Sequence, residues 1–186
     1  GKFAEDLGID VPIMTSNGAS LFDARARKQF DSMDFEDSKI RELLRFLMSR
    51  SADATLYSDE GIFFTPFSTR RAFVNSYNQG LEPSKQSPMI DIDMDFLEKE
   101  KLPNFNKILL ISADEELTGF LSADPELEVI SSAPNLFDVM RKGATKGNAL
   151  LSLADYLGIP RDNTFAIGDS DNDISMIESA KYGIAM

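Results

Sequence analysis

Hydrophobic and polar positions follow two different patterns along the chain. From about Ala24 to Met140, short apolar runs and amphipathic segments mix without a regular order, which predicts an α+β module. From Lys146 onward the order is helix, strand, helix, strand, and this order predicts parallel pairing in a doubly wound sheet. The apolar strand predicted at 12–16 is a candidate for the same sheet. We therefore expect an α/β protein built from two parts.

The elements can be placed from apolar periodicity, caps and turn residues. Strands are predicted at 12–16, 54–57, 62–65, 89–92, 107–111, 127–131, 136–141, 165–167 and 183–186, with a hairpin between the second and third. Helices are predicted at 2–7, 34–50, 68–77, 96–101, 115–121, 145–157 and 172–180. Gly8 ends the first helix, and Ser68 is the expected cap of the third. The best-defined helix has Thr145 as its N-cap and Gly158 as its C-terminal stop.

Charge narrows the range of partners. The chain has 19 basic and 31 acidic residues and a formal net charge of -12, which argues against a nucleic-acid or anionic-membrane partner. A small phosphorylated ligand still fits where a cation or a helix N-terminus reverses the local field. No apolar run approaches the roughly 18–20 residues that span a bilayer, and no signal peptide is recognisable. We expect a cytoplasmic monomer or homodimer.

Cysteine and histidine are both absent. Their absence excludes disulfides, thiol nucleophiles, histidine general bases and nearly every zinc hydrolase design. A metal bound by this chain needs oxygen ligands, which favours Mg²⁺ or Ca²⁺. Neither set of alternating aspartates, beginning at Asp91 or at Asp169, has the glycine and glutamate that a calcium-binding loop requires.

The densest polar cluster covers residues 168–173, Gly-Asp-Ser-Asp-Asn-Asp. It follows an apolar strand and opens a helix, at the end of a parallel strand where ligands bind in open α/β sheets. Four polar side chains and free helix N–H groups suit a hard cation next to a phosphate. A simple helix cap is the competing interpretation, because aspartates are common in first turns.

A longer pattern surrounds this cluster. Residues 146–186 contain, in order, KG-x-AL, LGI, AIGD-x-x-ND-x-x-M and GIAM. This pattern resembles the third and fourth motifs of the haloacid dehalogenase superfamily in its Cof-type phosphatase branch. Residues 16–19, Ser-Asn-Gly-Ala, resemble the point where the core of that family passes into its cap.

The resemblance implies a fold and its division. It implies a doubly wound, parallel-sheet, Rossmann-like core that is incomplete at the N-terminus and carries an inserted α+β cap domain. Residues 1–22 and 142–186 would belong to the core, and residues 23–141 would form the cap.

The resemblance also implies roles for individual residues. Lys146 would contact the transferring phosphoryl group, and Asp169 would ligate Mg²⁺. Asn172 would help to hold phosphate, and Asp173 would support the metal through its water shell. Gly168 would let the chain turn tightly after the strand. The implied reaction is Mg²⁺-dependent hydrolysis of a small phosphorylated metabolite, such as a sugar phosphate, through an aspartyl-phosphate.

Two motifs of that family have no match in these residues: the first, which carries the nucleophile, and the second, a Ser or Thr that ends another core strand and should precede the helix predicted at 2–7. The nucleophile lies in a D-x-D-G-T or D-x-D-G-V segment after an apolar strand, and the only D-x-D in an apolar setting here is Asp91-Ile92-Asp93. No Gly-Thr follows it, so we interpret it as an acidic strand edge or loop. We expect the nucleophile to lie outside the chain and the chain alone to be inactive. The alternatives are a non-catalytic metal- or phosphate-binding module and a purely structural domain.

Overall fold

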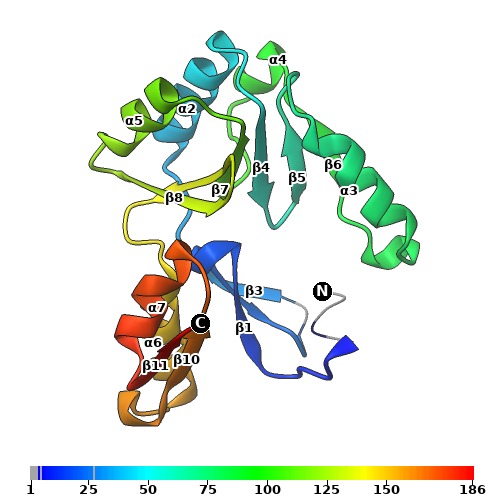
Figure 1. Cartoon of the computed structure of the whole chain (residues 1–186). Helices are drawn as coiled ribbons and strands as arrows, with labels where there is room; N and C mark the ends of the chain where they lie inside the picture. The colour runs from blue at the N-terminus through cyan, green and yellow to red at the C-terminus, as the bar shows by residue number, and fades with distance from the viewer. Residues whose placement is uncertain (1–3, 5, 27) are drawn as a thin grey trace.

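The computed structural model describes residues 4, 6–26 and 28–186 and shows a mixed α/β fold (Figure 1). Two groups of elements lie one above the other in the view of Figure 1, with the chain crossing between them twice. The crossings occur near Met33 and near Ala144.

The first group combines the two ends of the chain. Its elements are β1 (Pro12–Thr15), β2 (Ser20–Asp23), β3 (Lys28–Ser32), α6 (Lys146–Leu157), β10 (Phe165–Gly168), α7 (Ile174–Ser179) and β11 (Tyr182–Ala185). Short 3-10 turns cover Ser16–Gly18, Arg161–Asn163 and Asp171–Asp173. β10 and β11 are parallel, which confirms the prediction made from the order of the elements.

The first strand does not join that parallel pair. β1 pairs with β2 in antiparallel fashion and β2 with β3, so these three strands form a sheet of their own. The expectation of one shared sheet is therefore wrong for hydrogen bonding among the described residues. The reason is local: Asn17 and Gly18 return the chain at once, and β1 takes its own neighbour in sequence as its partner. β3 was not predicted at all.

The second group contains a six-stranded sheet with the order β6-β5-β4-β7-β9-β8. Its strands are β4 (Ala54–Ser58), β5 (Gly61–Phe64), β6 (Met89–Asp91), β7 (Phe105–Ile111), β8 (Leu127–Ala133) and β9 (Leu136–Arg141). Its helices are α2 (Asp37–Ser49), α3 (Arg70–Gln79), α4 (Met94–Leu97) and α5 (Glu115–Ser122), and a 3-10 turn covers Pro83–Lys85. The predicted β4–β5 hairpin is confirmed. We call this group the inserted sheet.

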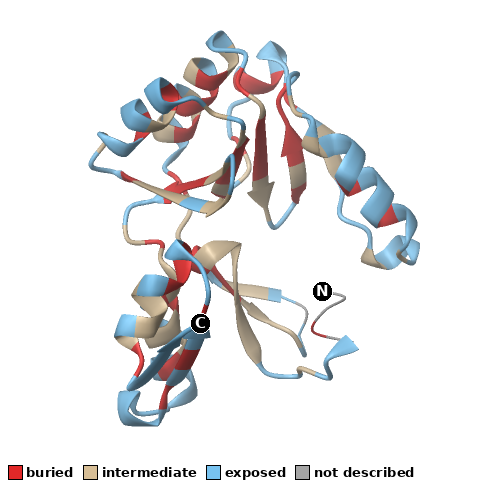
Figure 2. Ribbon diagram, viewed as in Figure 1, coloured by how far each residue is buried: buried red, intermediate tan, exposed pale blue. Residues whose placement is uncertain are grey.

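The main core lies between one face of the six-stranded sheet and the helices of the same group (Figure 2). On α2 the buried apolar stripe consists of Ile40, Leu43, Leu44 and Leu47, as the helical spacing predicts. Burying each such side chain stabilises the fold by roughly 1.5–3 kcal/mol. α2 begins at Asp37, later than predicted, because the N–H of Phe35 donates to the carbonyl of Phe105 at 2.8 Å and holds the chain extended.

Helix boundaries elsewhere show how far local signals reach. Thr145 accepts from the N–H of Asn148, and Gly158 has a left-handed φ of 66°, as predicted for α6. Ser68 does not cap α3: Thr69 holds that position without a side-chain bond, and the Ser68 hydroxyl is 2.7 Å from that of Thr55.

The predicted first helix lies only partly within the described residues. Residues 1–3 and 5 fall outside them, while Ala4 and Asp6 are helical and Gly8 has a left-handed φ of 65°. Within the described part of the chain, no helix combines the length and apolar character needed to cross a bilayer.

Candidate functional site

The loop after β10 is the centre of the candidate site. β10 ends at Gly168, and Asp171–Asp173 forms a 3-10 turn that leads into α7. Gly168 has no left-handed φ, so a positive φ is not the reason for a glycine at this position. A side chain at this position would clash, because a Cβ at Gly168 would lie 2.3 Å from the Cβ of Asp173. The missing side chain allows Asp173 to fold back over the end of the strand.

Asp173 is buried and is contacted by three donors. Its Oδ1 forms a short ion pair with the ammonium of Lys146, and its Oδ2 accepts from the N–H groups of Asp169 at 3.1 Å and Ser170 at 3.3 Å. Burial alone would raise the pKa of Asp173, but the Lys146 ammonium and these N–H groups outweigh burial and hold the pKa below its ordinary value. The carboxylate of Asp173 therefore holds the backbone of the loop and the ammonium of Lys146 together.

Lys146 stands at the first position of α6, where the helix dipole disfavours a cation. The carboxylate of Asp173 offsets this disadvantage. The N–H of Gly147 also donates to Ser175 Oγ at 3.1 Å, so the starts of α6 and α7 are tied together. The structure thus brings Lys146 and the 169–173 loop to one place, although 27 positions separate Lys146 from Asp173.

The side chains of Asp169 and Asn172 complete the predicted set. Asp169 is exposed, whereas Asn172 is buried and its Nδ2 donates to Asn17 Oδ1 at 3.4 Å. Asn17 also donates to Asp138 in the inserted sheet, at 2.5 Å. Neither of these contacts was predicted from the sequence. The signals for them were an Asn-Gly turn and a single aspartate within the apolar stretch 136–140.

The side chains of the site can supply part of the oxygen ligands that Mg²⁺ needs. Among the described residues, no group of three or more acidic side chains is placed to hold a metal ion. Mg²⁺ is commonly held by only one or two carboxylates together with waters and substrate phosphate oxygens. The exposed carboxylate of Asp169 can supply one such ligand. Asp173 has about one acceptor position left of roughly four, which leaves room for a metal-bound water.

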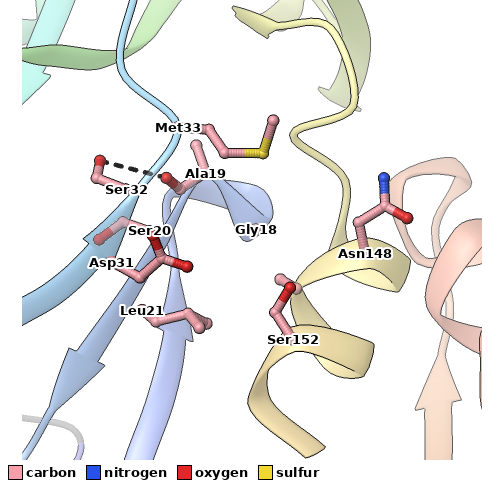
Figure 3. A pocket seen from close by; sticks show the side chains of 10 residues that line it. Gly18, Ala19, Ser20, Leu21, Asp31, Ser32, Met33, Asn148 and Ser152 are labelled. Carbon is pink, nitrogen blue, oxygen red and sulfur yellow. Dashed lines mark hydrogen bonds between the residues drawn. The ribbon is translucent and has the colours of Figure 1, made fainter. Parts of the chain in front are cut away.

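Two cavities lie near these residues. The smaller one, of about 30 Å³, lies between β2 and α6 (Figure 3), and its lining includes Ala19 and Leu21 from the β2 side and Asn148 and Ser152 from α6. It has room for water only. The larger cleft, of about 530 Å³, is lined by β1, the β2–β3 hairpin and the inserted sheet, and its lining includes Ser16, Phe22, Gln29, Tyr57 and Asn106. A cleft of this size accommodates a metabolite.

The alternative D-x-D segment has structural partners. Asp91 forms an ion pair with Arg71, and Asp93 caps α4 by accepting from the N–H of Phe96 at 2.8 Å. These contacts confirm the interpretation of this segment as a strand edge and loop. Arg71 at the start of α3 is thus the ion-pair partner of Asp91.

Comparison with known proteins identifies relatives along the whole chain. A family model described as haloacid dehalogenase-like hydrolase matches residues 1–186. A curated relative from Mycoplasma pneumoniae is 26% identical over 95% of the chain. The 5-amino-6-(5-phospho-D-ribitylamino)uracil phosphatase of Bacillus subtilis is 27% identical, and the match covers 96% of this chain and 68% of that protein.

A solved structure shows the same architecture. A haloacid dehalogenase-like hydrolase from B. subtilis superimposes with a TM-score of 0.79 and 26% identity, over 100% of this chain and 72% of that one. The chain spans about two thirds of the length of such relatives, 66% in the case of the Mycoplasma protein.

Proposed function

Because the chain belongs to the haloacid dehalogenase-like hydrolases, we propose that it carries the phosphate- and metal-binding part of a phosphatase for a small phosphorylated metabolite. The observation that carries this proposal is the junction of Lys146 with the 169–173 loop through Asp173. An ammonium, loop N–H groups and an exposed carboxylate at the end of a parallel strand suit a phosphoryl group and a hard cation.

Each residue has a part in the proposal. Lys146 supplies positive charge to the phosphoryl oxygens while Asp173 holds its position. Asn172 offers its amide to the phosphate, and Asp169 would ligate Mg²⁺. When bound, Mg²⁺ supplies charge neutralisation at the phosphate. Asp173, with its oxygens engaged, acts through the shell of water around the metal.

The larger cleft is the proposed place for the part of the substrate beyond the phosphate. It begins at Ser16, next to Asn17, and Asn17 contacts Asn172. Asn106 lines the cleft, is buried, and its Oδ1 has no hydrogen-bond partner among the described residues. A buried acceptor without a partner favours a ligand with hydroxyl or amine donors there. Tyr57 and Phe22 add apolar surface.

The nucleophile is proposed to lie outside these 186 residues. No D-x-D-G-T or D-x-D-G-V segment occurs in them, and Asp91 and Asp93 are engaged elsewhere. The 186-residue chain should therefore not hydrolyse p-nitrophenyl phosphate, while a form preceded by such a segment should. Turnover by the 186-residue chain itself would contradict this assignment. Phosphate binding without turnover in the longer form would favour a non-catalytic module.

Binding can be tested on the chain itself. We expect Mg²⁺ with inorganic phosphate to shift the backbone amide NMR signals of residues 168–173. Asp169→Asn should abolish the Mg²⁺-dependent part of the shift, whereas the neighbouring Asp171→Asn should keep it. Equal responses of the two variants would show that Asp169 does not ligate the metal.

A further inference from the structure

Asn17 lies where three separate segments of the chain meet. It follows β1 with φ 55° and ψ 29°, and Ser16 before it also has a positive φ of 51°. Two successive non-glycine residues in the left-handed region are unusual, although Asn tolerates it better than most residues. Such a conformation persists where the surroundings hold it in place.

On one side, Asn17 is held by the inserted sheet. Its Nδ2 donates to Oδ2 of Asp138 on β9 at 2.5 Å. Asp138 is only 2% exposed, and its Oδ1 lies 3.0 Å from the ammonium of Lys107 on β7. That ammonium also lies 4.7 Å from the ring centroid of Tyr57. One oxygen of the buried carboxylate thus accepts a hydrogen bond from Asn17, while the other faces the Lys107 ammonium as an ion pair without a hydrogen bond.

On the other side, Asn17 contacts the candidate site. Its Oδ1 accepts from Nδ2 of Asn172 at 3.4 Å. A carboxylate without a proton only accepts, so Asp138 requires the NH₂ side of the Asn17 amide. This requirement turns the Asn17 oxygen toward Asn172, and that oxygen in turn attracts the NH₂ group of Asn172. The orientation of one amide therefore determines the orientation of the next.

The same turn also reaches the start of α6. A Cβ at Gly18 would lie 2.3 Å from the carbonyl oxygen of Thr145 and 2.8 Å from the backbone nitrogen of Lys146. The Ser16–Gly18 turn therefore touches both segments that carry the proposed phosphate-binding groups.

We propose that Asn17 is a positioning residue for Asn172, and that Asp138 on the inserted sheet sets the orientation of the Asn17 amide. Phosphate binding at the 169–173 loop and docking of the inserted sheet are then coupled through one chain of contacts, Lys107–Asp138–Asn17–Asn172. This inference rests on the proposed function, in which Asn172 binds phosphate. Neither Asp138 nor Lys107 needs to touch the phosphate.

The first test exchanges the hydrogen-bond donor and acceptor between residues 17 and 138. Its probe is Mg²⁺ with inorganic phosphate. Asn17→Asp sets a second carboxylate against Asp138 and should weaken phosphate binding about tenfold, the effect of losing one charge-assisted hydrogen bond. Adding Asp138→Asn restores the pair in reverse, because the new amide donates to the new carboxylate, whose other oxygen accepts from Asn172. Binding should return to within about threefold of the parent. Failure of the second change to restore binding would overturn the proposal.

A matched control is available in the same region. Asn148 donates its Nδ2 to the carbonyl of Gly143 at 2.8 Å and belongs to no part of the proposed chain of contacts. Asn148→Asp should leave phosphate affinity unchanged. A loss as large as that of Asn17→Asp would mean that added negative charge, and not amide orientation, accounts for the effect.

The second test needs no phosphate. The side-chain amide NMR signals of Asn172 should shift on Asp138→Asn in the parent chain, but not when Asn17 is already replaced by Ala. Signals that do not move, or that move equally in both backgrounds, would overturn the coupling. If the parent chain binds no phosphate, the proposed function fails, and this measurement still decides whether Asp138 controls Asn172.

Discussion

The ammonium of Lys146 forms an ion pair with the carboxylate of Asp173, which joins the first turn of α6 to the loop that precedes α7. Asp173 is almost fully buried, and two backbone N–H groups also donate to it. Lys146 therefore has a structural role in the described chain in addition to its proposed contact with phosphate, and the two roles can be separated by experiment.

Replacing this lysine should lower stability in a pH-dependent way. Lys146→Met leaves a buried carboxylate without its cation and should destabilise the fold by about 1–3 kcal/mol at pH 7. The pKa of Asp173 is lowered in the native state, so its contribution is fully present above the ordinary aspartate pKa of about 3.9 and is lost as pH falls through the native value. Urea unfolding at pH 7 and pH 3 should show the difference between parent and variant shrinking at the lower pH.

A control for charge alone is Lys142→Met. Lys142 lies 3.0 Å from Glu128 but is 60% exposed, so its removal should change stability by less than about 0.5 kcal/mol. A Lys146→Met effect that is equally large at both pH values would show that lost packing, and not the ion pair, is responsible.

Replacing each of two helical glycines by alanine should change the stability of the fold in opposite directions. A Cβ at Gly147 in α6 would lie 2.3 Å from the backbone oxygen of Ser175, so Gly147→Ala must push the starts of α6 and α7 apart, at about 1–3 kcal/mol. A Cβ at Gly119 in α5 would meet nothing within 4 Å beyond its own helix backbone, and Gly119→Ala should stabilise by about 0.5–1 kcal/mol. Urea midpoints that move the same way in both variants would contradict the different packing of the two glycines.

Lys39 should be a stability determinant of the inserted sheet. It is 15% exposed and lies 2.8 Å from Asp124 and 3.1 Å from Glu126. The hydrogen bond to Asp124 raises the pKa of Lys39 against the opposing effect of burial, and it lowers the pKa of Asp124. Lys39→Met keeps an apolar stem but should cost about 1–3 kcal/mol, measured by thermal unfolding at pH 7.

The pH dependence of this contribution follows from the two shifts. A raised lysine pKa gives stability that is present below about pH 10.4 and lost above the native value, while a lowered aspartate pKa gives stability lost in acid. The effect of Lys39→Met should therefore be constant from about pH 6 to about pH 9. Arg45→Met is the control, because Arg45 is 54% exposed and 3.7 Å from Glu98; a comparable loss there would argue against a special role for Lys39.

Asp169 should matter for turnover and little for folding. In a form of the protein that hydrolyses p-nitrophenyl phosphate, Asp169→Asn should lower kcat by about 10²-fold or more, because the metal loses a carboxylate ligand. Its urea midpoint should stay within error of the parent, since the side chain is exposed. A variant that keeps the parental rate at limiting Mg²⁺ would remove Asp169 from the site.

Local signals explain what could be predicted from sequence. Thr145 and Gly158 delimit α6 because a cap hydroxyl and a left-handed glycine act within one helical turn. The stripe of α2 and the alternation of helices and strands after Lys146 are equally local. The 168–173 cluster stood out because its polar residues follow each other directly in the chain.

Tertiary contacts explain what could not be predicted. The sequence of β3, Lys-Gln-Phe-Asp-Ser, carries little strand signal, and it becomes a strand only by pairing with β2 across a bulge. Asn17 and Asp138 are 121 positions apart, and neither the Asn-Gly turn nor the apolar stretch around Asp138 indicates that the two residues meet. Their relation depends on how the inserted sheet sits over the turn after β1, which periodicity does not encode.

The inserted sheet begins and ends at almost the same point, because Arg141 at the end of β9 lies 3.6 Å from Glu36 just before α2. The roughly one hundred residues between these two points therefore form a loop whose ends lie next to each other. The entropy of closing such a loop grows only with the logarithm of its length, at about 0.6 kcal/mol per doubling. Evolution can therefore lengthen, shorten or replace this segment, and with it one wall of the larger cleft, with little effect on the framework that holds Lys146 and Asp169.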